Sequence, residues 1–151
     1  MKEVKASTLV EASQEEVFSF HNDPINLTRI FPAYLRIAIN DPPSQLRKGA
    51  LLQCNLHLGP LRFEWKVEVT DYSPPRQFID VQREGPFQHF VHTHTFEANG
   101  HGTRLTDIVE YELPPGSFSE LALRIGLDER IIDVLRYGQN VTKTLIEKKK
   151  T

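Results

Sequence analysis

Three consecutive stretches within Arg76–Leu113 alternate apolar and polar residues with a period of two. This period is typical of β-strands, in which successive side chains point to opposite faces of a sheet. In the third stretch, Leu105, Val109 and Tyr111 alternate with residues that include Arg104 and two glutamates, which must face water. The apolar set therefore forms the inner face. Asp107 shares its phase and is predicted to be buried.

The turn between the second and third stretches fixes which inner residues lie opposite one another. Ala98–Gly102 is rich in turn residues and predicts a hairpin. The inner residues of the two strands can face each other only if paired residue numbers add up to an odd sum. The central register sets His94 opposite Asp107 and Phe90 opposite Tyr111.

The first of the three stretches brings a second carboxylate to the same face. Gly85–Pro86 interrupts the ladder, because proline has no amide hydrogen to donate. A symmetric closure around this interruption sets His92 opposite Asp80. A shift of the register by one pair still leaves two inward carboxylates beside two inward imidazoles.

The inward polar residues Asp80, Gln82, His92, His94 and Asp107 permit several interpretations. A histidine oriented by a carboxylate could act as a general acid or base near neutral pH, with His94, His92, Asp107 and Asp80 as the catalytic candidates. The same groups could instead satisfy one another as a structural network, at a high cost if one were deleted. They could also orient a bound ligand.

A metal site is a further interpretation, because two histidines two residues apart and two carboxylates form a set of oxygen and nitrogen ligands. The sequence has a single cysteine, Cys54, so a multi-cysteine site is excluded. We expect neither a metal nor a cofactor. Phosphate-binding loops, nucleophile elbows and zinc-protease helices are absent from the sequence.

The rest of the chain predicts a strand, two short helices, three more strands and a long terminal helix. Ser13–Glu16 has the spacing of a capping box, and Asp23–Pro24 is a second helix start. From Ser117 the apolar period changes to threes and fours, which predicts a long helix with a break near Gly126–Asp128. The strands before the alternating region are expected at 4–10, Tyr34–Asn40, Ala50–Leu58 and Leu61–Tyr72.

Aromatic residues dominate the predicted inner face, and they could either fill a core or line a cavity. A pocket of this kind, with a few convergent polar groups, is the usual form of a small-molecule site. The candidate ligand-binding residues are Phe63, Trp65, Phe78, Gln82, Phe90, Phe96 and Tyr111 on the sheet, with Leu135 and Gly138 on the terminal helix.

Composition limits the classes of partner. The 151 residues fit one domain, 1–151, and the net charge of −2, with no basic stripe, argues against a nucleic-acid partner. The charged start MKEVK does not resemble a signal peptide, and no segment is long and apolar enough to span a membrane. The single cysteine suits a reducing compartment, so we expect a cytoplasmic protein. The oligomeric state stays open.

The order of elements resembles the helix-grip fold of the START-like, or SRPBCC, superfamily. The resemblance is sharpest over Phe78–Gly116, in FIDVQREGPFQHFVHTHTF and TRLTDIVEYELPPG, which is similar to the polyketide cyclase/dehydrase-like ligand-binding members. It implies an α+β domain with the order β-α-α-β6-α, in which a curved antiparallel sheet of about seven strands is wrapped around a long C-terminal helix. It also implies a cavity for an apolar or amphipathic small molecule.

The resulting hypothesis is a binding or carrier protein for a lipid, an isoprenoid or a polyketide-like molecule. The alternative is a cyclase or dehydratase, a lyase-like enzyme that uses a His-Asp acid/base pair. A protein-interaction module on the same fold is the third class, because fold alone does not determine function.

Overall fold

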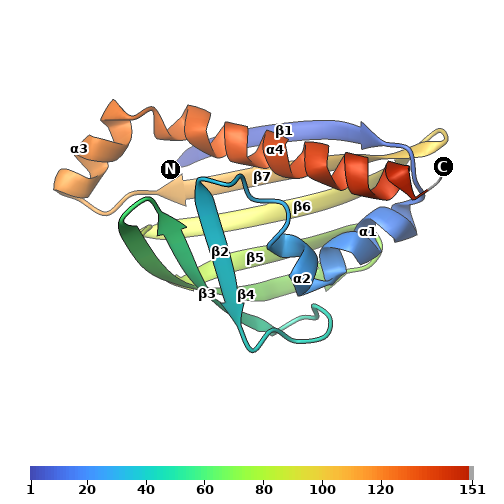
Figure 1. Cartoon of the computed structure of the whole chain (residues 1–151), viewed down its shortest axis with the longest axis horizontal. Helices are drawn as coiled ribbons and strands as arrows, with labels where there is room; N and C mark the ends of the chain where they lie inside the picture. The colour runs from blue at the N-terminus through green and yellow to red at the C-terminus, as the bar shows by residue number, and fades with distance from the viewer. Residues whose placement is uncertain (150–151) are drawn as a thin grey trace.

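The computed structural model describes residues 1–149 of the chain. It is an α+β protein in which one curved antiparallel sheet packs against helix α4 (Figure 1). The strands lie in the order β1-β7-β6-β5-β4-β3-β2. The strands are β1 (Lys2–Val10), β2 (Leu35–Asn40), β3 (Leu51–Leu58), β4 (Leu61–Ser73), β5 (Gln77–Glu84), β6 (His89–Asn99) and β7 (Gly102–Glu112), and the helices are α1 (Gln14–Asn22), α2 (Pro24–Leu27), α3 (Ser117–Arg124) and α4 (Leu127–Lys148).

The first strand of the chain pairs with the last. β1 is antiparallel to β7 from Lys2↔Tyr111 to Val10↔Thr103, so the N-terminal segment completes the sheet that the other strands begin. Because this pairing ties the start of the chain to strands formed much later, we propose that residues 1–151 form a single domain.

Both predicted helix starts are confirmed. The Ser13 hydroxyl accepts a hydrogen bond from the Glu16 amide at 3.2 Å, and the Asp23 carboxylate accepts one from the Ile25 amide at 3.0 Å. These side chains satisfy amides that have no partner within their own helices. Helices α1 and α2 consequently follow one another closely and cover one end of the sheet (Figure 1).

The predicted strand registers are also confirmed. His94 pairs with Asp107 and Phe90 with Tyr111 between β6 and β7, and His92 pairs with Asp80 between β5 and β6. An irregularity between β4 and β5, where the register shifts between Val69 and Asp71, was not predicted from the sequence. The extra residue bends β4, as β-bulges do, and helps the sheet to curve.

The predicted break in the terminal helix lies at Gly126. Its φ of 67° is left-handed, a conformation that glycine adopts without steric cost. The break separates α3 from the longer α4, so that α4 can lie along the concave face of the sheet (Figure 1).

Polar contacts hold α4 to the sheet at its start, middle and end. At the start, Asp128 accepts a hydrogen bond from Tyr111 and pairs with Lys2 at 3.1 Å. In the middle, Gln139 Nε2 donates to the Ala6 carbonyl at 2.9 Å, and near the end Lys143 donates to the Leu9 carbonyl at 2.9 Å. The helix is therefore fixed along β1.

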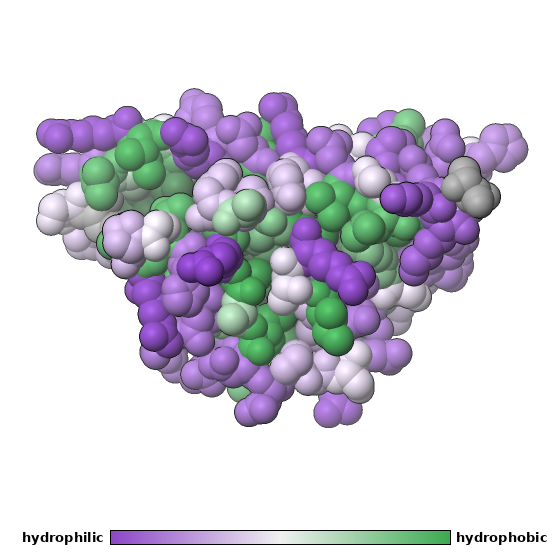
Figure 2. Space-filling model, viewed as in Figure 1, coloured by the Kyte–Doolittle hydropathy of each residue, from purple (hydrophilic) through white to green (hydrophobic). Residues whose placement is uncertain are grey.

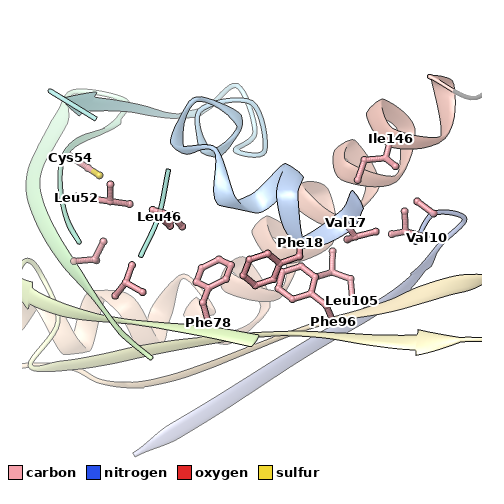
Figure 3. Packing of buried hydrophobic residues seen from close by; sticks show 13 residues of the cluster. Val10, Val17, Phe18, Leu46, Leu52, Cys54, Phe78, Phe96, Leu105 and Ile146 are labelled. Carbon is pink, nitrogen blue, oxygen red and sulfur yellow. The ribbon is translucent and has the colours of Figure 1, made fainter. Parts of the chain in front are cut away.

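The apolar core consists of two clusters on the concave side of the sheet. Figure 3 shows the larger one, in which the rings of Phe18, Phe78 and Phe96 lie together between α1 and the strands. Phe18 meets the other two edge-on, with centroids 6.1 Å and 5.2 Å away. The smaller cluster joins Phe90 and Tyr111 to the start of α4 and to β1.

No helix within the described residues is long and apolar enough to cross a membrane.

Candidate functional site

A cavity lies between the concave face of the sheet, α2 and the middle of α4. It offers about 100 Å³ to the centres of water-sized molecules. Since one water needs about 10–15 Å³ of such space, the cavity can hold several waters or a small organic group. Its wall is mostly apolar and includes four of the predicted ligand-binding residues, Trp65, Phe78, Leu135 and Gly138.

The outer face over this region mixes apolar and polar residues. Figure 2 shows hydrophobic residues interspersed with hydrophilic ones across the middle of the viewed face, between α4 and the segments that carry α2 and β2. Ile30 and Phe31, which follow α2, line the cavity from that side. The covering segment is thus apolar on the side that faces the cavity.

The four predicted catalytic residues come together in the cavity wall. His94 Nε2 lies 2.8 Å from Asp80 Oδ2, and His92 Nε2 lies 2.9 Å from Asp107 Oδ1. Both hydrogen bonds are diagonal across the ladder. On β5 the residue directly opposite His94 is Phe78 rather than Asp80, and on β7 the residue directly opposite His92 is Val109 rather than Asp107. The two imidazole rings stack with their centroids 3.7 Å apart.

His94 is the most enclosed member of this cluster, with 5% of its surface exposed. Its Nδ1 lies 3.0 Å from Asp107 Oδ1, but the N–H is not aligned for a hydrogen bond, so this contact is chiefly electrostatic. Burial lowers the pKa of His94, yet the carboxylates of Asp107 and Asp80 outweigh it and raise the pKa to about 9. The ring is therefore charged near neutral pH.

Asp107 is the matching anion. Burial alone would raise its pKa, but the hydrogen bond with His92 and the charges of His92 and His94 hold the pKa well below the usual value of 3.8. Only 6% of its surface is exposed. A buried carboxylate of this kind needs a full set of donors.

Gln139 on α4 supplies the remaining donor and was not among the predicted site residues. Its Nε2 donates to Asp107 Oδ2 at 2.7 Å and to the Ala6 carbonyl at 2.9 Å. Gln139 follows Leu135 by four positions, so the helical period places it on the buried stripe. A polar residue at a buried position of the helical period is the signal by which the sequence could have identified Gln139 as a site residue.

His21 on α1 is a second residue of the site that was not predicted from the sequence. Its Nδ1 is 3.0 Å from the Val17 carbonyl, which can only accept, so Nδ1 carries the proton. Burial lowers the pKa of His21 to about 4, against the opposing effect of that hydrogen bond. His21 lines the cavity and follows buried Val17 by four positions, which places it on the inner face of α1.

The other predicted ligand-binding residues lie outside the cavity wall. Phe90 and Tyr111 are buried in the smaller cluster, and Phe96 lies in the larger one. Gln82 accepts from Trp65 Nε1 at 3.1 Å and donates to the Phe87 carbonyl, so it closes the loop between β5 and β6 rather than joining the His-Asp cluster. The remaining one is Phe63, which is half-buried opposite Leu56. A binding role for these five stays a prediction.

Asp80, His92 and His94 could also present ligand atoms to a metal ion, within 4.8 Å of one another. A metal would have to replace the proton that His94 Nε2 shares with Asp80. The paired geometry favours protonated histidine, because both nitrogens of His94 already face carboxylates. Cys54 adds no ligand of consequence, since burial raises the pKa of its thiol to about 11.

Comparison with known proteins gives a family and a set of similar folds. Residues 10–136 match the family described as "Polyketide cyclase / dehydrase and lipid transport". No curated protein matches the sequence. The crystal structure of a protein from Thermus thermophilus has a TM-score of 0.69 and 20% identity, over 93% of this chain and 97% of that one.

Two further structures have the same fold. The protein Ms6760 from Mycobacterium smegmatis has a TM-score of 0.71 and 20% identity, with coverage of 97% of this chain and 92% of that one. The major latex-like protein 151 from Panax ginseng has a TM-score of 0.66 and 14% identity, with coverage of 95% of each chain. At these identities the similarity shows the helix-grip fold alone.

Proposed function

The chain belongs to the polyketide cyclase/dehydrase and lipid transport family, and from that membership we propose that it binds and carries a hydrophobic or amphipathic small molecule. The fold is a hydrophobic ligand-binding fold. The finer proposal concerns a lipid, an isoprenoid or a polyketide-like molecule held between the sheet and α4. A cytoplasmic location is part of the same proposal, supported by the free thiol of Cys54.

The observation that carries this proposal is the composition of the cavity wall. Apolar side chains from β3, β4 and β5 face α2 and α4 across the cavity, and the polar groups are confined to one cluster and a few isolated side chains. Such a wall favours apolar ligands through burial of their surface, at about 25 cal/mol per Å². The polar groups would fix the orientation of the ligand.

Native mass spectrometry of the protein purified from its own host tests the proposal. We expect a retained molecule whose mass identifies it as a lipid, isoprenoid or polyketide. A Trp65→Ala variant should retain less of it, because Trp65 lines the cavity. A variant of an outward residue, Glu64→Ala, is the matched control. Protein without any retained molecule, and with no affinity for apolar compounds, would contradict a carrier role.

A second function, acid/base catalysis, is favoured by the position of His94 between two carboxylates in the cavity wall. A charged imidazole could donate a proton during a dehydration or ring closure. His94→Ala distinguishes the two functions. For a structural cluster, the variant loses stability because Asp80 and Asp107 lose their partner. For a catalytic one, it stays folded while turnover is lost.

A further inference from the structure

Several acceptors in the cavity wall receive no hydrogen bond from the described residues. His21 carries its proton on Nδ1, so Nε2 has a free lone pair, and no residue in the described part of the chain donates to it. Both hydrogens of Gln139 Nε2 are used, which leaves Oε1 without a donor among residues 1–149. Asp80 uses Oδ2 for His94. The Nδ1–H of His94 is a donor that makes no hydrogen bond, but it is held 3.0 Å from Asp107 Oδ1. The Cys54 thiol and one amide hydrogen of Asn26 are further donors on the wall.

His21 is the best placed of these acceptors. Its ring packs edge-on against Phe96 at 5.2 Å and lies 6.4 Å from the ring of His94. The hydrogen bond to Val17 turns Nδ1 toward the backbone of α1, so Nε2 is the ring nitrogen farther from that backbone. A neutral imidazole with a fixed tautomer in an apolar wall accepts a hydrogen bond without being protonated itself.

The charge of the wall argues against anionic ligands. While both carboxylates are ionised, Asp80 and Asp107 contribute two negative charges and His92 and His94 at most two positive ones, so the cluster carries no positive surplus at neutral pH. No lysine or arginine lines the cavity in the part of the chain that the structure describes. A buried carboxylate without a cation is strongly disfavoured.

We propose that the cavity selects an uncharged apolar molecule that bears a hydroxyl group, an alcohol or a phenol, and that His21 Nε2 accepts the hydrogen bond from this hydroxyl. The inference rests on the proposed function and makes its ligand class specific. Carboxylates of the same size are excluded by the charge of the wall, whereas plain hydrocarbons bind less tightly because they leave the acceptor desolvated and unpaired.

Equilibrium dialysis at pH 7 with naphthalene, 2-naphthol and 2-naphthoate tests this selection, because the three probes share one ring system. We expect 2-naphthol to bind about three- to tenfold more tightly than naphthalene, the range of one neutral hydrogen bond. We expect 2-naphthoate to bind more weakly than either. Equal or tighter binding of the carboxylate overturns the proposal.

Variants isolate the part played by His21. His21→Phe keeps an aromatic ring but removes the acceptor, so the advantage of 2-naphthol over naphthalene should disappear while naphthalene still binds. His101→Phe, at an exposed position in the turn between β6 and β7, should preserve the advantage. An unchanged preference in folded His21→Phe refutes the role of His21.

Nitrogen-15 NMR of the wild-type histidines provides a readout that does not depend on the folding of a variant. The Nε2 resonance of His21 should move when 2-naphthol is added and stay in place with naphthalene. An unchanged Nε2 chemical shift of His21 in the presence of bound 2-naphthol contradicts the proposal. If none of the three probes binds, the carrier function itself fails, and that outcome is distinct from binding without selectivity.

Discussion

Asp107 lies directly opposite His94 in the β6–β7 ladder, and its Oδ1 is 3.0 Å from the Nδ1 of that ring. The other nitrogen of the ring faces Asp80 at 2.8 Å, so one imidazole lies between two carboxylates. Burial lowers the pKa of His94, but the two carboxylates outweigh it and raise the pKa above the ordinary value of about 6.5. The stability of the protein at alkaline pH depends on this arrangement.

We predict that stability falls between pH 6.5 and 9. The pKa of His94 is about 9 in the folded protein and about 6.5 in the unfolded chain, so its contribution is fully present below pH 6.5. It is lost as the pH rises through 9, at a cost on the order of 2–3 kcal/mol. Urea unfolding across this range should show the decline in wild type and a flatter profile in His94→Gln. Parallel profiles would contradict the pairing.

His21 should give the opposite dependence at lower pH. Its folded pKa of about 4 lies below the unfolded value, so the unfolded chain binds more protons between pH 4 and 6.5. The free energy of unfolding should therefore drop by about 1–2 kcal/mol as the pH falls from 6.5 to 4.5. This value includes a reduction for the partial exposure of the ring to the cavity. The drop should be absent in His21→Phe and retained in His101→Phe, and a drop of equal size in both variants would rule out His21 as its cause.

Replacement of Gln139 by leucine should destabilise the fold. The change leaves the Ala6 carbonyl and Asp107 Oδ2 without their buried donor, which costs about 1–3 kcal/mol. Asn140→Leu, at the exposed neighbouring position of α4, should leave the unfolding free energy within about 0.5 kcal/mol of wild type. Equal effects of the two changes in urea denaturation would show that the Gln139 amide has no structural role.

Gly138→Ala should also destabilise the protein, although alanine is the better helix former by about 1 kcal/mol. An added Cβ would lie 3.0 Å from the Ile30 carbonyl oxygen and 3.4 Å from Ile30 Cβ. Because the backbone carbonyl must move to relieve this contact, we expect a net loss of about 1 kcal/mol. Asn140→Ala measures the helix-propensity gain alone and should raise the melting temperature slightly. A higher melting temperature in both variants would show that the backbone at Ile30 moves away from the added Cβ at little cost.

The sequence was sufficient for the strand phases, because one charged strand determines the inner face and short turns limit the register. That is why Asp107 and both histidines were placed correctly in the ladder. The sequence could not predict the hydrogen-bond partners of the two histidines. Side-chain torsions rather than Cα pairing direct His92 to Asp107 and His94 to Asp80.

Phase also could not separate the core from the cavity wall. Trp65 and Phe90 share the inner face and touch edge-on at 5.2 Å, yet Trp65 lines the cavity while Phe90 does not. The difference depends on where α2 and α4 close over the sheet. His21 and Gln139 were missed because the inner faces of the helices were predicted from apolar residues alone. Both residues are polar and lie on those inner faces.

The attachment of α4 at Asp128, Gln139 and Lys143 determines which side of the cavity can adapt to ligands of different size. These contacts run along β1 and β7, whereas β2 on the far side is an edge strand that pairs with β3 alone. Longer ligands should therefore displace β2, β3 and the segment after α2 before they displace α4. In a series of homologous alcohols, the ligand-induced changes in amide chemical shift of residues 35–40 and 51–58 should then grow with chain length. The changes for residues 2–10 should stay nearly constant.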